Sequence, residues 1–217
     1  MKALRFSALA LAMAFAPLAA SAQDGALAIT AGFGSLDGSG NPLPGVQHEM
    51  PTPYSHLDTD NSDTVFSGSL TWFPSKQWGF EVWASQSAKQ SVEIDNELAP
   101  DQFAASYTVR PVMLSAQYHF APMGRLKPFV GLGWHWTSVG GIKQDNTLID
   151  RFDLSGDNGW AAVAGLDVTL SGGWFARADV RYMDWSTERT EPGNATAPKK
   201  STGMNSTYYG AAIGYRF

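Results

Sequence analysis

The chain has 217 residues, a formal net charge of −5 and no cysteine, so disulfide bonds are excluded as a source of stability. An acidic chain without a basic cluster also argues against nucleic acid as a partner. Glycine and aromatic residues are abundant, with 22 Gly, 8 Trp, 7 Tyr and 12 Phe, whereas only 16% of residues are charged. This composition is typical of many short strands joined by turns, and the length favours one domain.

The N-terminal segment has the parts of a secretory signal peptide. Lys2 and Arg5 supply a positive head, an apolar run follows, and Ala20–Ala22 provides a cleavage site of small residues. The apolar run is short for a membrane anchor, which needs about 20 residues. We therefore expect residues 1–22 to be a cleaved signal peptide and residues 23–217 to be the mature domain.

Eight segments alternate between apolar and small or polar side chains with the period of two that indicates β-strands. In chain order they are Ala26–Phe33, Thr64–Phe73, Trp78–Ser85, Tyr107–Phe120, Phe129–Trp136, Ala162–Leu170, Ala176–Met183 and Tyr208–Phe217. No apolar run after residue 22 is long enough for a membrane helix. The sequence therefore predicts an all-β protein with an even number of antiparallel strands.

The links between these segments alternate in length. The short links are Pro74–Gln77, Ala121–Lys127 and Ser171–Gly173. The polar links of about 20 to 30 residues, which we expect to be loops, are Gly34–Asp63, Ser87–Ser106, Val139–Asn158 and Thr187–Ser206. Tight turns on the periplasmic side and long loops outside are typical of outer-membrane barrels. We expect an eight-stranded transmembrane β-barrel of a bacterial outer membrane, with both termini in the periplasm.

The residue types on the two alternating faces distinguish this barrel from the alternative, a soluble barrel or sandwich. A soluble barrel has a richly charged outer face, whereas here one face is aliphatic and aromatic and the other is small, polar and rich in glycine. We expect aromatic girdles at Trp72, Trp78, Tyr118, Phe120, Trp160, Trp174 and Tyr215. We expect an interior network of paired polar groups formed by Glu81, His119, Asp167, Arg177, Asp179 and Arg181.

The last strand ends in alternating aromatics, Tyr215 and Phe217. Outer-membrane proteins commonly carry such an ending, which the barrel-assembly machinery is thought to read. We therefore expect this machinery to be a partner, beside outer-membrane lipid and lipopolysaccharide. Because lipid cannot satisfy an exposed strand edge, the first and last strands must also pair.

Several short stretches carry a family resemblance: Gly79-Phe80-Glu81-Val82, Arg110-Pro111-Val112, Ala116-Gln117-Tyr118-His119-Phe120, Leu126–Gly133, Gly159-Trp160-Ala161-Ala162, Gly165-Leu166-Asp167, Tyr182-Met183-Asp184 and Gly214-Tyr215-Arg216-Phe217. They resemble the OmpW family of small outer-membrane barrels, which includes proteins of the AlkL type. From Arg110 onwards they fall in the order of that family's strands four to eight, whereas the N-terminal half matches mainly by pattern. The resemblance implies a passive channel for small hydrophobic molecules, which enter from outside and leave sideways into the bilayer through a gap in the wall.

The resemblance also suggests residues for this channel. A lateral exit needs a broken ladder, and Pro111 cannot donate a ladder hydrogen bond, although a proline at the outer end of a strand can also be harmless. Bulky apolar side chains close the channel floor in this family, and the matching inward positions here are Trp83 and Arg181. We assign Trp83, Arg181, Met113 and Met183 to the channel lining or gate. Arg181 either forms a cation–π plug over Trp83 or pairs with Glu81 or Asp179.

Other readings of the polar residues remain open. His48 and His56 lie near an Asp58–Asp63 run that resembles the start of a calcium loop, but the required Gly and the distal Glu are missing, so we expect no metal. No serine pairs convincingly with a rim histidine, and we expect no cofactor and no enzyme activity. The alternatives are a structural or adhesion barrel that acts through its loops, or a lipid-modifying enzyme that uses His48 or His56.

Overall fold

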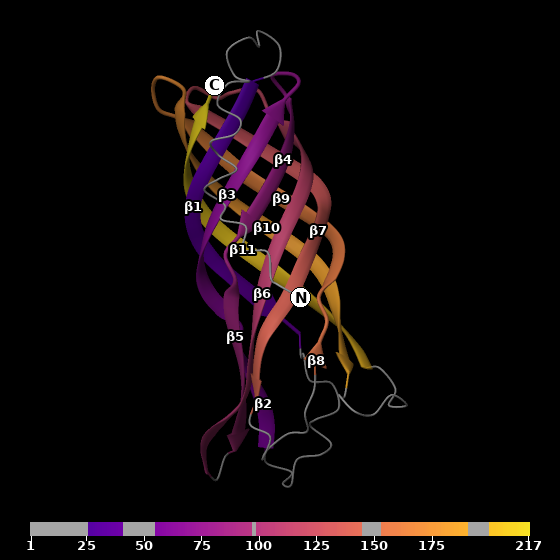
Figure 1. The fold of residues 1–217 in the computed structure, drawn as a ribbon. Helices are drawn as coiled ribbons and strands as arrows, with labels where there is room; N and C mark the ends of the chain where they lie inside the picture. Colours follow the sequence, from indigo (N-terminus) through magenta and orange to yellow (C-terminus); the bar gives the residue numbers. More distant parts are fainter. Residues whose placement is uncertain (1–25, 41–54, 97–98, 145–152, 191–199) are drawn as a thin grey trace.

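The computed structural model describes residues 26–40, 55–96, 99–144, 153–190 and 200–217. They form one antiparallel sheet that closes into an eight-stranded barrel (Figure 1). Its elements are β1 (Ala26–Ser39), β2 (Ser55–Asp60), β3 (Ser62–Phe73), β4 (Trp78–Ser85), β5 (Ala88–Asn96), β6 (Ala99–His119), β7 (Leu126–Gln144), β8 (Asp153–Leu154), β9 (Asp157–Thr169), β10 (Trp174–Thr190) and β11 (Lys200–Arg216). No helix in the described part of the chain is long and apolar enough to cross a membrane.

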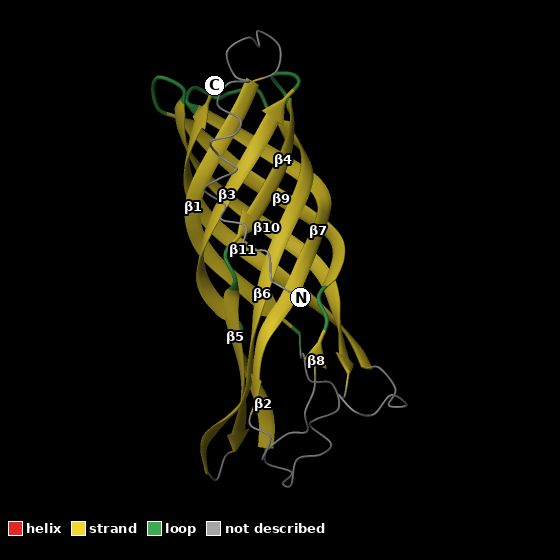
Figure 2. Ribbon diagram, in the orientation of Figure 1, coloured by secondary structure: helices red, strands yellow, loops and turns green. Residues whose placement is uncertain are grey.

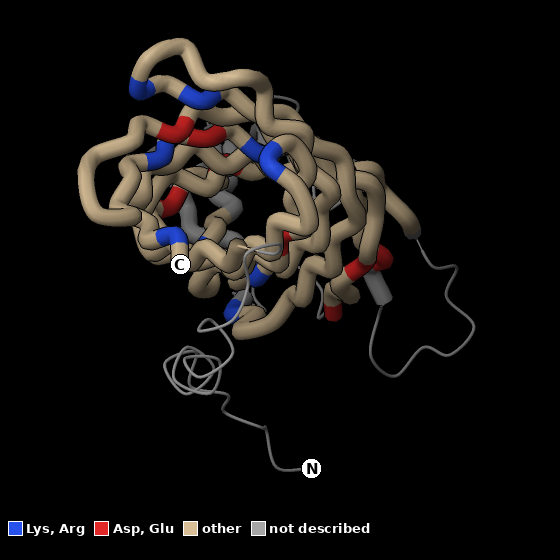
Figure 3. Tube along the Cα trace, turned by 90° about the horizontal axis from the view of Figure 1, so that it is seen from above, with Lys and Arg blue, Asp and Glu red and all other residues tan. Residues whose placement is uncertain are grey.

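The first and last strands close the barrel, as the sequence predicts. β1 pairs with β11 from Ala28↔Arg216 to Ser39↔Asn205, and with β3 on its other edge. β6 and β7 pair across the opposite wall, so the sheet closes on itself. Seen along its axis, the trace forms a ring (Figure 3). Closure satisfies the backbone groups that lipid could not.

The three short links lie together at one end, which the sequence assigns to the periplasm (Figure 2). One of the two four-residue links joins β9 to β10, where Leu170 N–H donates to the Trp174 carbonyl at 2.9 Å. Gly172 and Gly173 have φ values of 58° and 85° in this turn. Residues with a side chain rarely adopt such φ values, so glycine at both positions permits the tight turn.

The prediction of four long polar loops is wrong in part, because strands fill much of these segments. β1 continues to Ser39, β5 and β6 occupy most of Ser87–Ser106, β7 continues to Gln144, and β11 already begins at Lys200. These extensions lie at and beyond the extracellular edge of the apolar belt, where the outer face no longer needs apolar side chains, although the inner face still includes the buried Leu36, Ala88 and Ala105. With polar residues on the outer face and apolar residues only at some inner positions, hydropathy alternation no longer reveals the strand.

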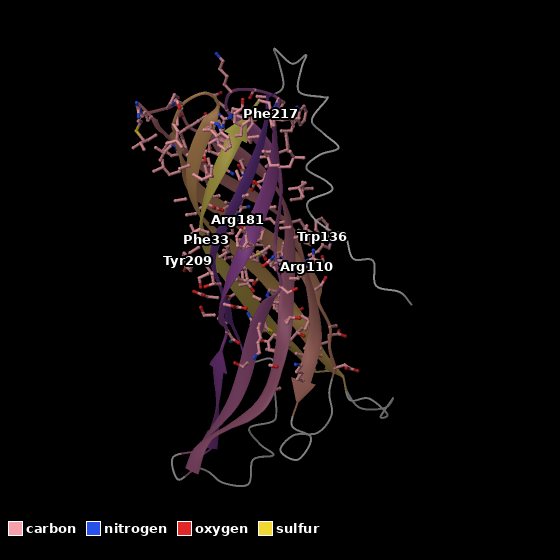
Figure 4. All side chains as sticks on the ribbon, turned by 60° about the vertical axis from the view of Figure 1, so that its left-hand side comes forward. Phe33, Arg110, Trp136, Arg181, Tyr209 and Phe217 are labelled. Carbon is pink, nitrogen blue, oxygen red and sulfur yellow. The ribbon has the colours of Figure 1, made fainter. Side chains whose placement is uncertain are left out.

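The outer wall is apolar, as the alternation predicts. Its exposed side chains include Phe33, Phe66, Trp72, Trp78, Phe80, Leu114, Phe120, Leu132, Trp134, Trp136, Trp160, Trp174, Tyr209, Ile213 and Phe217. Of the expected girdle residues, Tyr118 and Tyr215 are half-buried against neighbouring rings. Phe33, Trp136 and Tyr209 lie on the wall at one level, far from Phe217 at the periplasmic end (Figure 4). Exposed aromatics at two levels are typical of the two membrane interfaces.

Candidate channel interior

Inward-facing side chains divide the interior along the barrel axis. The polar floor, near the periplasmic end, consists of Glu81, Gln117, His119, Asp167, Arg177, Asp179 and Arg181. The Trp83 layer above it consists of Trp83, Met113, Met183 and Tyr208. The apolar zone, further towards the outside, consists of Leu36, Val65, Ala88, Ala105, Tyr107, Val109 and Met204, and the buried polar side chains of Gln90 and Ser106 lie beside it. The change from polar to apolar occurs along single strands, so it does not depend on loops.

Glu81 of β4 is the centre of the polar floor. One carboxylate oxygen accepts from Arg177 at 2.8 Å, and the other accepts from Arg181 at 2.7 Å. Arg177 also donates two hydrogen bonds, of 2.7 and 3.0 Å, to the carboxylate of Asp167. Because these charges are nearly inaccessible to solvent, each needs its partners to offset the cost of losing water. The network therefore joins β4, β9 and β10 across the interior.

His119 and Gln117, both on β6, complete this network. Gln117 donates from Nε2 to Glu81 at 2.7 Å, and its carbonyl oxygen lies 3.2 Å from His119 Nε2. The His119 ring stacks on Phe129 with centroids 4.9 Å apart. The six residues expected to form an interior polar network are thus brought together. Gln117 was not assigned to the network from sequence, although its inward parity with Met113 and His119 gives the signal.

Arg181 makes both of the interactions that the sequence left as alternatives. Its Nε donates to Asp179 at 2.6 Å while Nη1 donates to Glu81, and its guanidinium carbon lies 4.7 Å from the centroid of the Trp83 ring. The Arg181 side chain is almost fully buried, at a level between Phe217 and Phe33 (Figure 4). Arg181 therefore links the polar floor to the layer above it.

The Trp83 layer closes the polar floor on the outer side. The Trp83 ring lies 5.0 Å from the Tyr208 ring, and the Tyr208 hydroxyl is hydrogen-bonded to Ser67 at 2.7 Å. Met113 and Met183 are fully buried beside them. Tyr208 was not assigned to the site from sequence, because an inward tyrosine on the last strand does not reveal its cross-barrel neighbour.

The wall beside the apolar zone contains a stretch without a ladder, which we call the open seam. The β3–β4 ladder ends at Ser67↔Ser85, extended by one bond from Gln86 N–H to the Phe66 carbonyl, and the β2–β5 ladder begins only at Asp60↔Ser91. The open seam therefore lies between residues 61–65 and residues 87–90. No backbone ladder joins β3 to β5 over these described residues.

Side chains supply the few hydrogen bonds that cross the open seam. Asp63 accepts the backbone N–H of Lys89 at 2.7 Å, and the Gln90 amide donates weakly to the Asn61 carbonyl at 3.4 Å. The buried side-chain oxygens of Asn61 and Gln90 have no hydrogen-bond partner among the described residues. Val65 and Ala88 line the inner side of the seam and are almost fully buried. The apolar zone therefore reaches the weakest stretch of the wall.

Pro111 lies close to the open seam but not in it. It stays in register with Thr137 on β7, and the β4 ladder with β6 ends next to it at Ala84↔Val112. His119 N–H points towards β4, so alternation directs the Pro111 nitrogen to the same side. There, three residues from Ser85 to Ser87 face two residues of β6 before pairing resumes at Ala88↔Val109. Pro111 thus faces the irregular segment Ser85–Ser87 between β4 and β5, and the other edge of this segment borders the open seam.

Aromatic rings and cations fill the periplasmic mouth. Phe73 and Phe175 are buried there, and the Arg216 guanidinium carbon lies 4.5 Å from the centroid of the Phe73 ring. Tyr215 and Phe217 face outward, and their ring centroids are 5.0 Å apart. The assembly role of this pair stays a prediction.

The histidines considered for metal or catalysis are not brought together. His48 lies outside the described residues, and His56 is described only by its position on β2. His135 is buried and interacts with Thr137 and the Asp184 carbonyl. The described residues contain no group of three or more acidic, histidine or cysteine side chains placed to hold a metal ion. No element of the described structure thus supports a site built on these histidines.

The closed sheet, the apolar outer wall and the filled polar interior define a bacterial outer-membrane β-barrel. More specifically, the chain belongs to the OmpW family, whose model matches residues 23–217. The outer membrane protein AlkL of Ectopseudomonas oleovorans is 26% identical over 133 residues, which cover 59% of this chain and 55% of AlkL. PahQ of Pseudomonas aeruginosa, a dibenzothiophene metabolism operon protein, is 24% identical over 51% of each chain. The chain thus spans about half the length of the curated relatives it matches.

Solved structures of relatives have the same fold. The crystal structure of OprG from Pseudomonas aeruginosa matches with a TM-score of 0.66 and 23% identity, covering 89% of this chain and 96% of OprG. The solid-state NMR structure of AlkL in DMPC lipid bilayers matches with a TM-score of 0.62 and 22% identity, covering 91% and 92% of the two chains. These similarities show that the barrel is common to this chain and to both proteins.

Proposed function

We propose that this barrel passes small hydrophobic molecules passively through the outer membrane and releases them sideways into the bilayer. The observation that carries the proposal is the contact between the apolar zone and the open seam. Val65 and Ala88 belong to both, so an apolar solute in the zone borders a stretch of wall without a ladder. An apolar solute gains free energy by leaving water for such surroundings.

The polar floor favours release of the solute sideways through the wall over passage straight on to the periplasm. To continue to the periplasm, an apolar solute would have to pass the ion pairs of Glu81 with Arg177 and Arg181. Separating these buried charges without replacing their partners is costly. Over the described residues the open seam presents no backbone ladder, and the hydrogen bonds that Asp63 and the Asn61 carbonyl accept cross it. The barrier to release is therefore lower through the wall than through the floor.

The relatives support the same class of solute. PahQ and DoxH are named for dibenzothiophene metabolism, and dibenzothiophene is an apolar aromatic molecule. The resemblance to AlkL-type proteins likewise implies hydrophobic cargo. We propose no covalent step and no cofactor for the channel.

In this proposal, Trp83, Met113 and Met183 form the base of the solute path, and Arg181 holds that base to the polar floor. Pro111 favours opening because it offers no donor to the irregular segment Ser85–Ser87. A single donor restored at this position would tie β4 more firmly to β6. The open seam, on the other edge of β4 and β5, would then open less readily.

The test is the rate at which dibenzothiophene enters intact Gram-negative cells that express the barrel. We expect Trp83→Ala, Arg181→Ala and Pro111→Ala each to slow entry, because the first two expose charged groups to the path and the third tightens the wall. Trp174→Phe, on the periplasmic side of the outer wall, serves as the matched control. Folded barrel is quantified by heat-dependent gel mobility, and rates are divided by it. If all three variants take up dibenzothiophene as fast as the unchanged protein, the channel proposal is wrong.

A further inference from the structure

Two cations face outward where the apolar belt ends on its extracellular side. On β6 the outward side chains from Phe120 back to Val112 are uncharged, and the next one is the exposed Arg110. On β5, the exposed Lys89 is in register with Thr108, two residues from Arg110 on the same face of β6. Such diagonal neighbours have Cα atoms roughly 7–8 Å apart, within joint reach of one ligand.

A shallow groove in the outer wall begins beside Arg110. In the β6–β7 ladder Arg110 is in register with Ser138, and Ser138 and Trp136 line this groove of about 420 Å³, which is largely open to the outside. Asn158 on the neighbouring strand β9 and Gly156 just before it also line the groove, and Asn158 accepts a hydrogen bond from the indole of Trp134 at 3.0 Å. Arg110 and Trp136 lie close together on the wall (Figure 4). Arg110 therefore stands at the edge of a shallow groove lined by polar and aromatic residues, and Lys89 lies next to Arg110 on the side away from the groove.

Among the described residues, the charges nearby leave the two cations free to bind an anion. Neither Arg110 nor Lys89 has a side-chain ion pair or hydrogen bond within the described residues. Asp63 accepts only the backbone N–H of Lys89, and the Asp157 carboxylate in the groove accepts a hydrogen bond from the Ser186 hydroxyl at 2.5 Å. The carboxylates are therefore engaged elsewhere, whereas both cations point outward.

We propose that Arg110 and Lys89 bind a phosphate of the lipid A part of lipopolysaccharide, with the adjoining sugar in the groove beside Trp136. The change from apolar to charged side chains marks the level of the lipid headgroups, where cations attract phosphate and tryptophan is favoured. A guanidinium is well suited to a phosphate because it can donate two parallel hydrogen bonds. At this end of an outer-membrane barrel the headgroups belong to the outer leaflet, so lipopolysaccharide is the anion that meets the site.

The proposal is tested by equilibrium binding of lipid A to the full protein folded in neutral detergent. Arg110→Gln and Lys89→Gln should each weaken binding about fivefold, as expected for one cation near an anionic lipid surface. Arg125→Gln, which removes an exposed cation at the opposite end of the barrel, should leave binding unchanged. Lipid A with both phosphates removed should bind the unchanged protein as weakly as lipid A binds the double variant.

Three results would overturn the site. One is unchanged lipid A affinity in both variants, and another is an equal loss in Arg125→Gln, which would mean general charge attraction. The third is phosphatidylglycerol or inorganic phosphate binding as tightly as lipid A, which would remove lipopolysaccharide as the specific ligand. No hydrophobic solute is present in this assay, so its outcome does not depend on the proposed channel activity.

Discussion

The two halves of the barrel interior differ in the polarity of their side chains and in the backbone pairing of the wall around them. In the periplasmic half, Glu81, Arg177 and Asp167 bind one another across three strands, and the surrounding wall is fully laddered. In the extracellular half, Val65 and Ala88 are apolar and lie against a wall that lacks a ladder. The periplasmic half can therefore hold the barrel closed and stable while the extracellular half changes shape.

The barrel wall itself shows the same contrast. β10 and β11 are paired without interruption from Trp174↔Tyr215 to Arg189↔Lys200. In the described part of the chain no backbone ladder joins β3 to β5, and side chains supply the bonds from Lys89 N–H to Asp63 and from Gln90 to the Asn61 carbonyl. Opening of the wall at the seam therefore need not disturb the strands that close the barrel.

The largest effect is expected from Glu81→Gln. The change removes the charge shared by Arg177 and Arg181, and leaving buried cations without a full partner costs about 3–5 kcal/mol. The free energy of unfolding in urea, measured on the protein in detergent micelles, should fall by this amount. Asp153→Asn, at an exposed position on β8, is the control and should change stability by less than about 0.5 kcal/mol. A stable Glu81→Gln barrel would contradict the view that the polar floor needs its charges.

A smaller effect is expected from Val109→Thr in the apolar zone. The two side chains have almost the same shape, but the new hydroxyl is buried among apolar groups, which costs about 1–3 kcal/mol if it finds no partner. Val109→Ala separates the effect of polarity from that of volume. Hydrophobic solute entry should slow more with Thr than with Ala, and the reverse order would show that size, not polarity, limits passage.

A smaller loss still is expected from Arg216→Gln at the periplasmic mouth. The side chain is 31% exposed, lies 3.7 Å from Asp167 and stacks on Phe73. A partly exposed cation–π contact contributes about 0.5–1 kcal/mol, so stability should fall by that amount. Hydrophobic solute entry should not change, because the residue lies below the polar floor. Slower entry in this variant would indicate a path that continues to the periplasm.

The smallest effect on stability is expected from Pro111→Ala. The residue keeps its register with Thr137, and the substitution mainly frees the unfolded chain, so the change should stay within about 1 kcal/mol. Its effect should be local. Amide hydrogen exchange should slow in Ala84–Ala88 and remain the same in β10 and β11. An equal change of the exchange rate in all strands would contradict a coupling between Pro111 and the open seam.

Local alternation predicts much of this molecule. The inward parity of Glu81, Arg177 and Arg181 follows from the period of two, and so do the outward aromatics and the closed barrel. Which inward groups meet depends on the stagger of strands far apart in sequence, so the contact between Trp83 and Tyr208 is not predictable from local pattern. The open seam is a mismatch between two ladders, with Asp60↔Ser91 and Ser67↔Ser85 out of step, and such a register cannot be read from either strand alone.

The most direct test of the account is a cross-link across the open seam. The chain has no cysteine, so Thr64→Cys and Ser87→Cys introduce one exposed thiol on each edge, and a disulfide or a short bis-maleimide joins them. Entry of dibenzothiophene into cells should fall to the level without the barrel when the pair is joined. It should recover when a disulfide-linked pair is reduced, and each single-cysteine variant should behave like the unchanged protein. Undiminished entry through the cross-linked barrel would contradict lateral release at this seam.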